Sequence, residues 1–427
     1  MELLLALFAG IFSGFLIGLI PGLSVSFVII LSLPFLGYFD LLQLLTFYLA
    51  VLSSSQYSET IVALLLGVPG ESTSLPVVEA RKDINEKDIS QTLYNCATGS
   101  FVGSMLSVVI TMIVFYFLKD STFYLKTWFM LFVVSAGLIL ATISSDNRWY
   151  ETLAMMAFGW ALSKIGYDSN TGKDFLTFDN TYLYGGIPTI SVLVSLFILP
   201  NLLAIPSYVS SRMSYKYHPA SLRMVPWAAS MRGTIVGYLT GLIPYVGSII
   251  SSNISYFIEK KMRSPVPSQV TAAETANNAA FFSVIAPMLI FGIAIVPTQG
   301  MLLEVIAKNL IKFDWNAVEK IMLSLAGIMV LINAINWIIN IKAISLALKL
   351  SSIPINQIKI FGLLASILGA AYMGHDVGQM WYYVIAMACL APLGYLAKGK
   401  DMLPLIFVFL LQSEVEFAIV RLWSMIL

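Results

Sequence analysis

The sequence predicts an all-α polytopic membrane protein with about 10–14 membrane segments, built as a two-fold inverted repeat of broken helices and re-entrant hairpins. Three observations carry this prediction. Of the 427 residues, 58% are hydrophobic and 11% are charged, whereas soluble domains carry about 25% charged residues. Two apolar runs are too long for one membrane helix and contain glycine and proline at their middle. The same breaks occur once in each half of the chain.

The composition also excludes several function classes. The chain has 24 Lys plus Arg and 23 Asp plus Glu, so it has no charge excess that would favour nucleic acid. The two cysteines, Cys96 and Cys389, have neither zinc nor haem spacing, and we interpret them as packing residues. Phosphate-binding, zinc-protease and nucleophile-elbow motifs are absent from the sequence. We therefore expect neither an enzyme nor a cofactor.

The apolar segments give the expected elements in order. The N-terminal run, "MELLLALFAGIFSGF", has no basic region before it, so we expect a first membrane segment and not a cleaved signal peptide. Because a spanning helix needs about 20 apolar residues, we expect further spans near the following residues: 39–55, 91–117, 122–143, 149–165, 186–206, 316–340, 357–373 and 379–397.

Two segments fit a single span badly. Residues 2–36 and 224–258 are apolar runs with the letters Gly-Leu-Ile-Pro at their middle, at an offset of 223 residues. A second pair of breaks, at Pro69 and Pro297, follows at an offset of 228. Matched breaks in the same order indicate an internal duplication, with a first membrane repeat at 1–210 and a second at 211–427.

The charges give the two repeats opposite orientations. No Lys, Arg or His precedes Arg81, so the first Gly-Pro segment has no basic residue at either end. Basic residues flank the second Gly-Pro segment on both sides: Arg212, Lys216, Arg223, Lys260, Lys261 and Arg263. Under the positive-inside rule, the first hairpin has both ends outside the cell and the second has both ends in the cytoplasm.

The breaks have a chemical consequence. Proline removes an amide and glycine lets the chain turn, which frees backbone groups that are costly in hydrocarbon unless they line a cavity. Half-helix N-termini present amides to an anion, and unwound carbonyls suit a small cation. We therefore predict that the residues beside the four breaks bind substrate: Pro21, Gly22, Ser24, Ser26, Pro69, Gly70, Glu71, Ser72, Thr73, Pro244, Gly247, Ser248, Asn253, Pro297, Thr298 and Gln299.

A separate polar group lies in the helix before the last break. In "TAAETANNAAFF", the residues Glu274, Asn277 and Asn278 share a helical face by i, i+3 and i, i+4 spacing. They offer carbonyl oxygens, amide donors and one charge. We predict that they bind the coupling cation, which is Na⁺ or H⁺; no other metal is expected.

Each of these features has a structural alternative. One Gly-Pro break alone is more often a packing feature of membrane helices. Glu59, Glu71 and Glu274 are either buried or interfacial. His375 and Asp376 form either a proton relay or, more often in such patterns, a loop between helices. In the last segment, Glu414, Glu416 and Arg421 lie at an interface or form an internal ion pair.

At these motifs the sequence resembles the large membrane subunit of the tripartite tricarboxylate transporters, the TctA family. The resemblance covers nearly the whole chain. The matching segments are "GLIPGLSVSFVIILSLPF", "ALLLGVPGESTSLPVVEARK", "LSKIGYDSNTGKDFLTFDNTYLYGGIP" and "MRGTIVGYLTGLIPYVGSIISSNISYFIEKK" followed by "AAETANNAAFF". The chain departs from the family pattern at Pro244-Tyr245 and Pro297-Thr298, where the family has Pro-Gly, and at Glu79-Ala80, where it has Asp-Gly.

The resemblance implies cation-coupled uptake of an organic carboxylate across a prokaryotic plasma membrane. It also implies partners: a small membrane subunit and a periplasmic or extracellular binding protein. Two alternatives remain at this point, an anion-permeable channel and a membrane subunit that acts only with its partners. The sequence leaves the carboxylate, the oligomeric state and the direction of transport open.

Overall fold

A computed structural model describes residues 2–20, 25–66, 75–118, 128, 131–132, 134–139, 142, 147–168, 173–204, 218–242, 247–291, 294, 296–308, 318–342, 355–374, 376–398, 400–412 and 415–416. These residues are mostly helical. In the first part of the chain the helices are α1 (Glu2–Gly18), α2 (Val25–Leu36), α3 (Leu41–Leu66), α4 (Leu75–Ala80), α5 (Glu86–Leu118), α7 (Trp149–Ser163), α8 (Thr189–Leu193) and α9 (Leu199–Ala204). In the rest they are α10 (Trp227–Gly241), α11 (Gly247–Lys261), α12 (Val266–Phe291), α13 (Pro297–Lys308), α14 (Val318–Lys342), α16 (Ile355–Tyr372), α17 (Val377–Leu396) and α18 (Leu403–Leu410).

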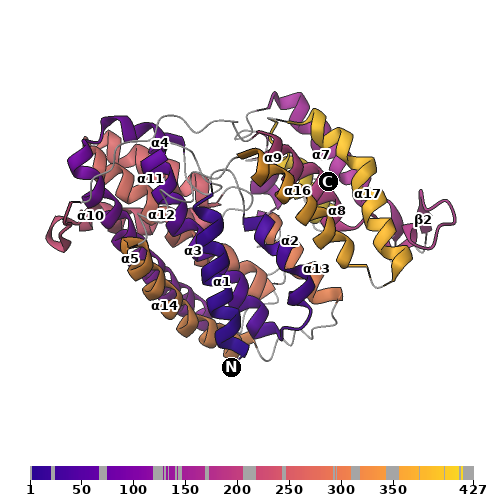
Figure 1. Cartoon of the computed structure of the whole chain (residues 1–427), viewed down its shortest axis with the longest axis horizontal. Coiled ribbons are helices and arrows are strands. Elements are labelled where there is room, and N and C mark those ends of the chain that lie inside the picture. Colours follow the sequence, from indigo (N-terminus) through magenta and orange to yellow (C-terminus); the bar gives the residue numbers. More distant parts are fainter. Residues whose placement is uncertain are drawn as a thin grey trace.

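The helices form two groups that lie side by side (Figure 1). The first group contains α1, α3, α4, α5, α10, α11, α12 and α14. The second contains α7, α8, α9, α16, α17 and α18. Helices α2 and α13 contact each other and lie between the groups, since α2 also contacts α1, α3 and α16, and α13 also contacts α8 and α18.

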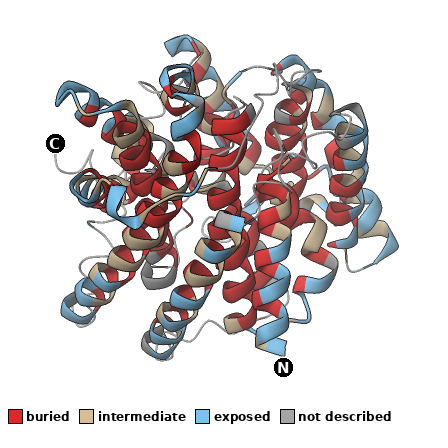
Figure 2. Cartoon of the chain, turned by 60° about the vertical axis from the view of Figure 1, so that its left-hand side comes forward, coloured by how far each residue is buried: buried red, intermediate tan, exposed pale blue. Residues whose placement is uncertain are grey.

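Three described helices are long and apolar enough to cross a membrane: Lys87–Phe117, Lys320–Asn340 and Val377–Leu396. Helices α3 and α12 each have 26 residues, which is also long enough to span, but both carry polar segments. Buried residues lie between the helices and exposed residues lie on their outward faces (Figure 2). Many of the exposed residues are large and apolar. An exposed apolar surface of this kind suits lipid.

The helix ends agree with the four predicted breaks. Among the described residues, α1 ends at Gly18 before α2 begins at Val25, α3 ends at Leu66 before α4 begins at Leu75, α10 ends at Gly241 before α11 begins at Gly247, and α12 ends at Phe291 before α13 begins at Pro297. Pro297 is the first residue of its helix, where a missing amide leaves no hydrogen bond unmade.

One of the predicted span boundaries was wrong. The span predicted at 39–55 continues to Leu66, because the polar residues 53–60 remain helical and bond to neighbouring helices instead of ending the segment. The span predicted at 186–206 begins at Thr189 and contains a π-helical turn, η4 (Val194–Ile198), between α8 and α9. On this stretch, Ser191 and Ser195 donate hydrogen bonds to two backbone carbonyls of α17, those of Tyr383 and Met387.

Helix α1 packs on α3 through a row of three glycines. Gly10, Gly14 and Gly18 meet the α3 backbone at Phe47, Val51 and Ser55, in the same order. A methyl group added at Gly18 would lie 2.5 Å from the Ser55 carbonyl oxygen. Glycine at every fourth position permits this close approach of two membrane helices. The matching order of the contacts shows that α1 and α3 run parallel.

Helix α10 packs on α12 in the same way. Gly233, Gly237 and Gly241 meet the α12 backbone at Ala272, Ala276 and Ala280. A methyl group added at Gly241 would again lie 2.5 Å from a carbonyl oxygen, that of Ala280. Helices α10 and α12 therefore also run parallel, and their glycines occupy the positions of the α1 glycines plus 223.

An ion pair closes the α10–α11 hairpin at its base. Arg232 donates from Nε to Glu259 Oε1 at 2.6 Å and from Nη2 to Oε2 at 3.0 Å. The Glu259 side chain is fully buried, and Ser264 donates a further hydrogen bond to it at 2.6 Å. A bidentate pair of this kind fixes both distance and orientation, so α11 is held against α10 and the start of α12.

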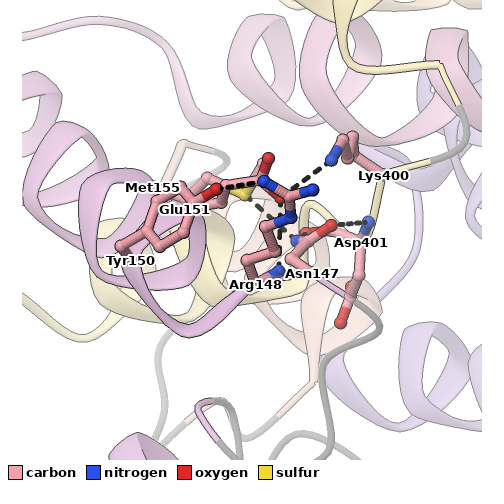
Figure 3. Close-up of polar contacts among 7 residues, drawn as sticks. All are labelled: Asn147, Arg148, Tyr150, Glu151, Met155, Lys400 and Asp401. Carbon is pink, nitrogen blue, oxygen red and sulfur yellow. Dashed lines mark hydrogen bonds and ion pairs between the residues drawn. The ribbon is translucent and has the colours of Figure 1, made fainter.

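The start of α7 is tied to the segment before α18 (Figure 3). Asn147 Nδ2 donates to the Asp401 backbone carbonyl at 2.7 Å, and Asn147 Oδ1 accepts from the Asp401 backbone amide at 3.3 Å. Lys400 contacts Glu151 at 2.7 Å, and Glu151 also accepts from the Arg148 amide. These contacts place the two segments of the second group in a fixed register.

The structure adds one feature to the predicted all-α fold. After α7 the chain forms a hairpin of β1 (Gly166–Asp168) and β2 (Lys173–Phe175), paired antiparallel, which projects from the second group (Figure 1). Tyr382 anchors its base by stacking on Tyr182 and by donating to the Gly186 carbonyl at 2.8 Å.

Candidate functional site

The two parallel helix pairs meet where α3 crosses α12. Thr60 Oγ1 donates a 2.5 Å hydrogen bond to Glu274 Oε2, and Gln56 Nε2 donates a 3.3 Å hydrogen bond to Asn277 Oδ1. All four residues are buried. The residue numbers rise along one helix as they fall along the other, so α3 and α12 run antiparallel at this crossing.

Helix α14 extends the buried polar layer on one side of α3. The Tyr57 hydroxyl donates to Asn333 Oδ1 at 3.2 Å, the Ser54 hydroxyl donates to Asn336 Oδ1 at 2.8 Å, and the Asn340 amide donates to the Tyr57 carbonyl at 2.8 Å. Because interhelical hydrogen bonds in membrane proteins contribute about 0.6 kcal/mol each, the three together hold α3 against α14.

Helix α5 plays the corresponding part for α12. The Asn278 amide donates to Ser100 Oγ at 2.9 Å and to the Glu274 carbonyl at 3.1 Å, and the Ser104 hydroxyl donates to the Asn278 carbonyl at 3.3 Å. Each crossing helix therefore has its own partner, α14 for α3 and α5 for α12.

Two oxygens at the crossing accept no hydrogen bond from the described residues. They are Glu274 Oε1 and Gln56 Oε1, and both are inaccessible to solvent. Buried polar atoms without a partner are rare in native proteins and call for an explanation such as a bound water or ion. Glu274 also forms no ion pair among the described residues. The nearby Glu59 is a second carboxyl group and cannot neutralise it. The crossing therefore presents spare acceptor oxygens and an ionisable carboxyl group inside the protein.

The three residues predicted to bind a cation lie around this crossing but point to two neighbours. Glu274 and Asn277 face α3 through Thr60 and Gln56, whereas the Asn278 side chain faces α5. The residues at i+3 and i+4 lie on opposite sides of the residue at i, and each meets a different helix.

Nine of the predicted substrate residues lie outside the described residues: Pro21, Gly22, Ser24, Pro69, Gly70, Glu71, Ser72, Thr73 and Pro244. Of the others, Gly247 begins α11 and Pro297 begins α13. Ser26 Oγ and Asn253 Oδ1 are buried and have no hydrogen-bond partner among described residues. Ser248 is partly buried in the first turn of α11.

The first turn of α13 lies on α3 and α12. Thr298 Oγ1 and the Tyr48 hydroxyl are 2.8 Å apart, and Gln299 Nε2 donates to the Val284 carbonyl at 3.0 Å. Gly241, the last residue of α10, meets α12 at Ala280 and Ser283. The second-half breaks on either side of α12 therefore meet that helix at the same level, one to two turns beyond Asn277.

The first half shows a matching position. Gly18, the last residue of α1, meets α3 at Ser55, which precedes Gln56, and at Ser58. The described ends of three broken segments thus surround the polar crossing of α3 and α12.

Several residues of this layer were missed from the sequence, among them Gln56, Thr60 and the three α14 asparagines. Two signals were available. The segment "SSSQYSET" is polar along a full two turns inside a long helix, and the asparagines of "NAINWIIN" lie at i, i+3 and i+7 on one helical face. The predicted span ends at residue 55, inside the first of these segments, so the segment does not stand out as one polar stretch of a single helix.

The remaining acidic predictions resolve individually. Glu59 is buried and accepts a 2.6 Å hydrogen bond from Ser55, so it is not interfacial. Asp376 caps α17 by accepting from the Gln379 amide at 2.7 Å, which is the role of a helix-capping loop residue. Glu416 forms the internal ion pair that was one of its two interpretations, with Lys164 at 2.7 Å. Glu71, His375, Glu414 and Arg421 lie outside the described residues.

The charges at the two ends of the first group differ. Arg81 and Lys82 precede α5, while Lys260 and Lys261 end α11. These segments lie together, because α11 contacts α4 and Tyr256 of α11 belongs to the same buried cluster as Ala80 and Ile84. At the opposite end, Gln43 donates to Glu2 at 3.2 Å beside Asp40. The described part of the first group therefore has a basic end and an acidic end.

A surface pocket of about 260 Å³ lies apart from the polar layer, between α7, the β-hairpin and α18. Its lining includes Tyr167, Tyr184, Gly186, Thr189, Phe409 and Gln412. None of the residues predicted from the sequence lines this pocket.

Comparison with known proteins decides the family. Residues 4–408 match the tripartite tricarboxylate transporter TctA family. The chain belongs to the TctA family. It is a membrane transporter component and not an enzyme.

Two relatives carry names that state no function. One is a 52.8 kDa protein of Agrobacterium vitis from the TAR-I ttuC' 3' region, 25% identical over 432 residues, covering 96% of this chain and 84% of that protein. The other is a protein of Methanocaldococcus jannaschii, 24% identical over 207 residues, covering 48% of this chain and 52% of that protein. No solved structure matches this chain.

Proposed function

We propose that this TctA-family chain is a secondary transporter that imports an organic anion of the di- or tricarboxylate class, driven by a Na⁺ or H⁺ gradient. The observation that carries the proposal is the buried polar layer at the α3–α12 crossing, with the ends of broken helices around it. Discontinuous helices near the middle of a membrane are the usual place where transporters hold substrate and ion.

The proposal includes an inverted repeat. Support comes from the two glycine rows, which recur at an offset of 223 and meet the parallel partner helix at positions offset by 225. The two pairs, α1 with α3 and α10 with α12, run in opposite directions, as an inverted repeat requires. The pairing of α2 with α13, and of α4 with α11, joins the post-break helices of one half to those of the other.

The substrate carboxylates would meet backbone amides after the four breaks. Support among the described residues comes from α13, whose first turn lies on α3 and α12, and from two buried polar atoms without partners, Ser26 Oγ and Asn253 Oδ1. Amides at a half-helix N-terminus attract anions without a charged side chain. The four breaks themselves lie largely outside the described residues.

The coupling cation would bind at Glu274. A carboxylate buried in a membrane protein without a basic partner is costly unless it is neutralised. A proton or a metal cation supplies this neutralisation, and its release on the other side of the membrane returns the cost. Asn277 lies beside Glu274 at the crossing, and Asn278 holds the same turn of α12 against α5.

The setting of the transporter follows from the family. We place the chain in the prokaryotic plasma membrane with its basic end in the cytoplasm. Its partners would be a small membrane subunit and an extracytoplasmic binding protein that delivers the carboxylate, since the family is tripartite.

Uptake into proteoliposomes tests the proposal. Purified protein is reconstituted alone and then with its partners, and radiolabelled di- and tricarboxylates are supplied under an inward Na⁺ gradient, an inward H⁺ gradient or neither. The expected result is accumulation above the external concentration only under one gradient. Flux that equilibrates without any gradient would indicate a channel instead.

A further inference from the structure

The sequence predicts a cation site whose residues all lie on α12. The structure places residues of α3 beside them. We infer that Gln56 and Thr60, from the first half of the chain, complete the cation site of Glu274 and Asn277 in the second half. This inference rests on the proposed function and adds to it that the ion binds between the two halves.

Two side chains of α3 donate hydrogen bonds at the crossing. The Thr60 hydroxyl donates to Glu274 Oε2, and the Gln56 amide donates to Asn277 Oδ1. What remains is a set of acceptors, with Glu274 Oε1 and Gln56 Oε1 lacking any partner among the described residues. A group of spare carbonyl and carboxylate oxygens suits a hard cation and not an anion.

A buried water alone does not balance a carboxylate charge at these acceptors. Glu274 and Asn277 are fully buried, and Gln56 is 5% exposed. A water molecule would satisfy acceptors but leave the charge of Glu274 in place, whereas a cation does both. Both sources of positive charge, Na⁺ and H⁺, share this chemistry.

The position of the site gives the ion a mechanical role. Helix α3 is held by α14 and helix α12 by α5. Thr60 and Gln56 hydrogen-bond α3 to α12, and these two helices contact each other less than either contacts its own partner. An ion bound by oxygens from both helices therefore adds to a connection that is otherwise made by few contacts. Occupancy would control how tightly α3 and α12 associate.

The experiment measures cation-dependent stability of the purified full-length protein in detergent. The midpoint of thermal unfolding is followed against NaCl at constant ionic strength with choline chloride, and separately against pH without sodium. The variants are Thr60→Val and Gln56→Leu, which remove oxygens while keeping similar size, and Glu274→Gln. Thr46→Val is the matched control, because Thr46 is fully buried in the same helix and its hydroxyl, unlike that of Thr60, has no described partner.

We expect cation-dependent stabilisation of the wild type, by sodium or by acidification, and at least a tenfold higher half-saturating concentration in Thr60→Val and Gln56→Leu. Thr46→Val should respond as the wild type does. If Thr60→Val and Gln56→Leu keep the wild-type response while Glu274→Gln loses it, the shared site is wrong but the proposed cation site stands. If Glu274→Gln also responds normally, or the wild type does not respond, both are wrong. Should a variant fail to fold, Thr60→Ser and Gln56→Asn are used, and an unchanged response in Gln56→Asn, which withdraws the oxygen by one methylene, overturns the inference.

Discussion

Thr60 and Glu274 lie 214 positions apart in the sequence and share a 2.5 Å hydrogen bond between the hydroxyl and Oε2. Their contact joins α3 to α12, and through them the two glycine-packed helix pairs. Both residues are buried. A change in the protonation of Glu274, or in ion binding there, therefore changes its hydrogen bond to α3. The predictions below test this arrangement and the packing that supports it.

Removal of the asparagine side chains should abolish coupled uptake. Asn277→Ala removes the acceptor of the Gln56 amide, and Asn278→Ala removes the contact to Ser100. Each change should lower stability by only about 0.6 kcal/mol per lost hydrogen bond, so the variants remain folded. Uptake under a cation gradient and size-exclusion chromatography measure the two effects. Wild-type uptake in both variants would remove these residues from the cation site.

The glycine rows should tolerate no large side chain. Gly14→Leu and Gly237→Leu force a side chain onto the carbonyls of Val51 and Ala276, which should destabilise each variant by about 1–3 kcal/mol. Gly327→Leu is the matched control, because no atom lies within 4 Å of an added methyl group there. Unfolding in mixed micelles of increasing denaturing detergent measures the difference. Equal stability of all three variants contradicts the packing.

The Arg232–Glu259 pair should hold the second hairpin closed. Arg232→Gln leaves the buried Glu259 carboxylate with only Ser264 as a described donor. The loss should be roughly 2 kcal/mol, below the value for a fully buried pair, because Arg232 is 36% exposed. Thermal unfolding gives the loss, and accessibility of a cysteine on α11 to a thiol reagent reports opening. Partial recovery in the exchanged pair Arg232→Glu with Glu259→Arg is expected.

The orientation predicts where cysteines react. In a background with Cys389→Ala, Tyr38→Cys lies beside Asp40 at the acidic end and should react with an impermeant thiol reagent added to intact cells. Lys261→Cys at the basic end should react only after the cells are opened. Tyr38 is 80% exposed and the remaining Cys96 is buried, so the background signal is low. The reverse labelling pattern would show that the chain has the opposite orientation in the membrane.

The breaks could be predicted from the sequence because glycine and proline act on their own local backbone. Gly18 and Gly241 each end a helix at the repeated letters, and Pro297 begins one. The difference in charge between the ends of the first group could also be predicted, since it depends only on which loops carry lysine and arginine.

The composition of the polar layer could not be predicted in the same way. Gln56 and Asn277 are 221 residues apart, so nothing local says that they meet. The spacing of Glu274, Asn277 and Asn278 indicated one helical face, but it did not show that Asn278 contacts a different helix from the other two. The partners of Asn333 and Asn336 likewise depend on how α14 packs on α3.

Gradient-driven accumulation by the Glu274→Gln variant tests the central claim most directly. Wild-type protein, Glu274→Gln and the control Glu151→Gln, which alters the exposed contact to Lys400, are reconstituted at equal density and supplied with a transported carboxylate under the cation gradient. The account predicts accumulation by wild type and by Glu151→Gln, and none above the external concentration by Glu274→Gln. Accumulation by Glu274→Gln to the wild-type level would contradict it.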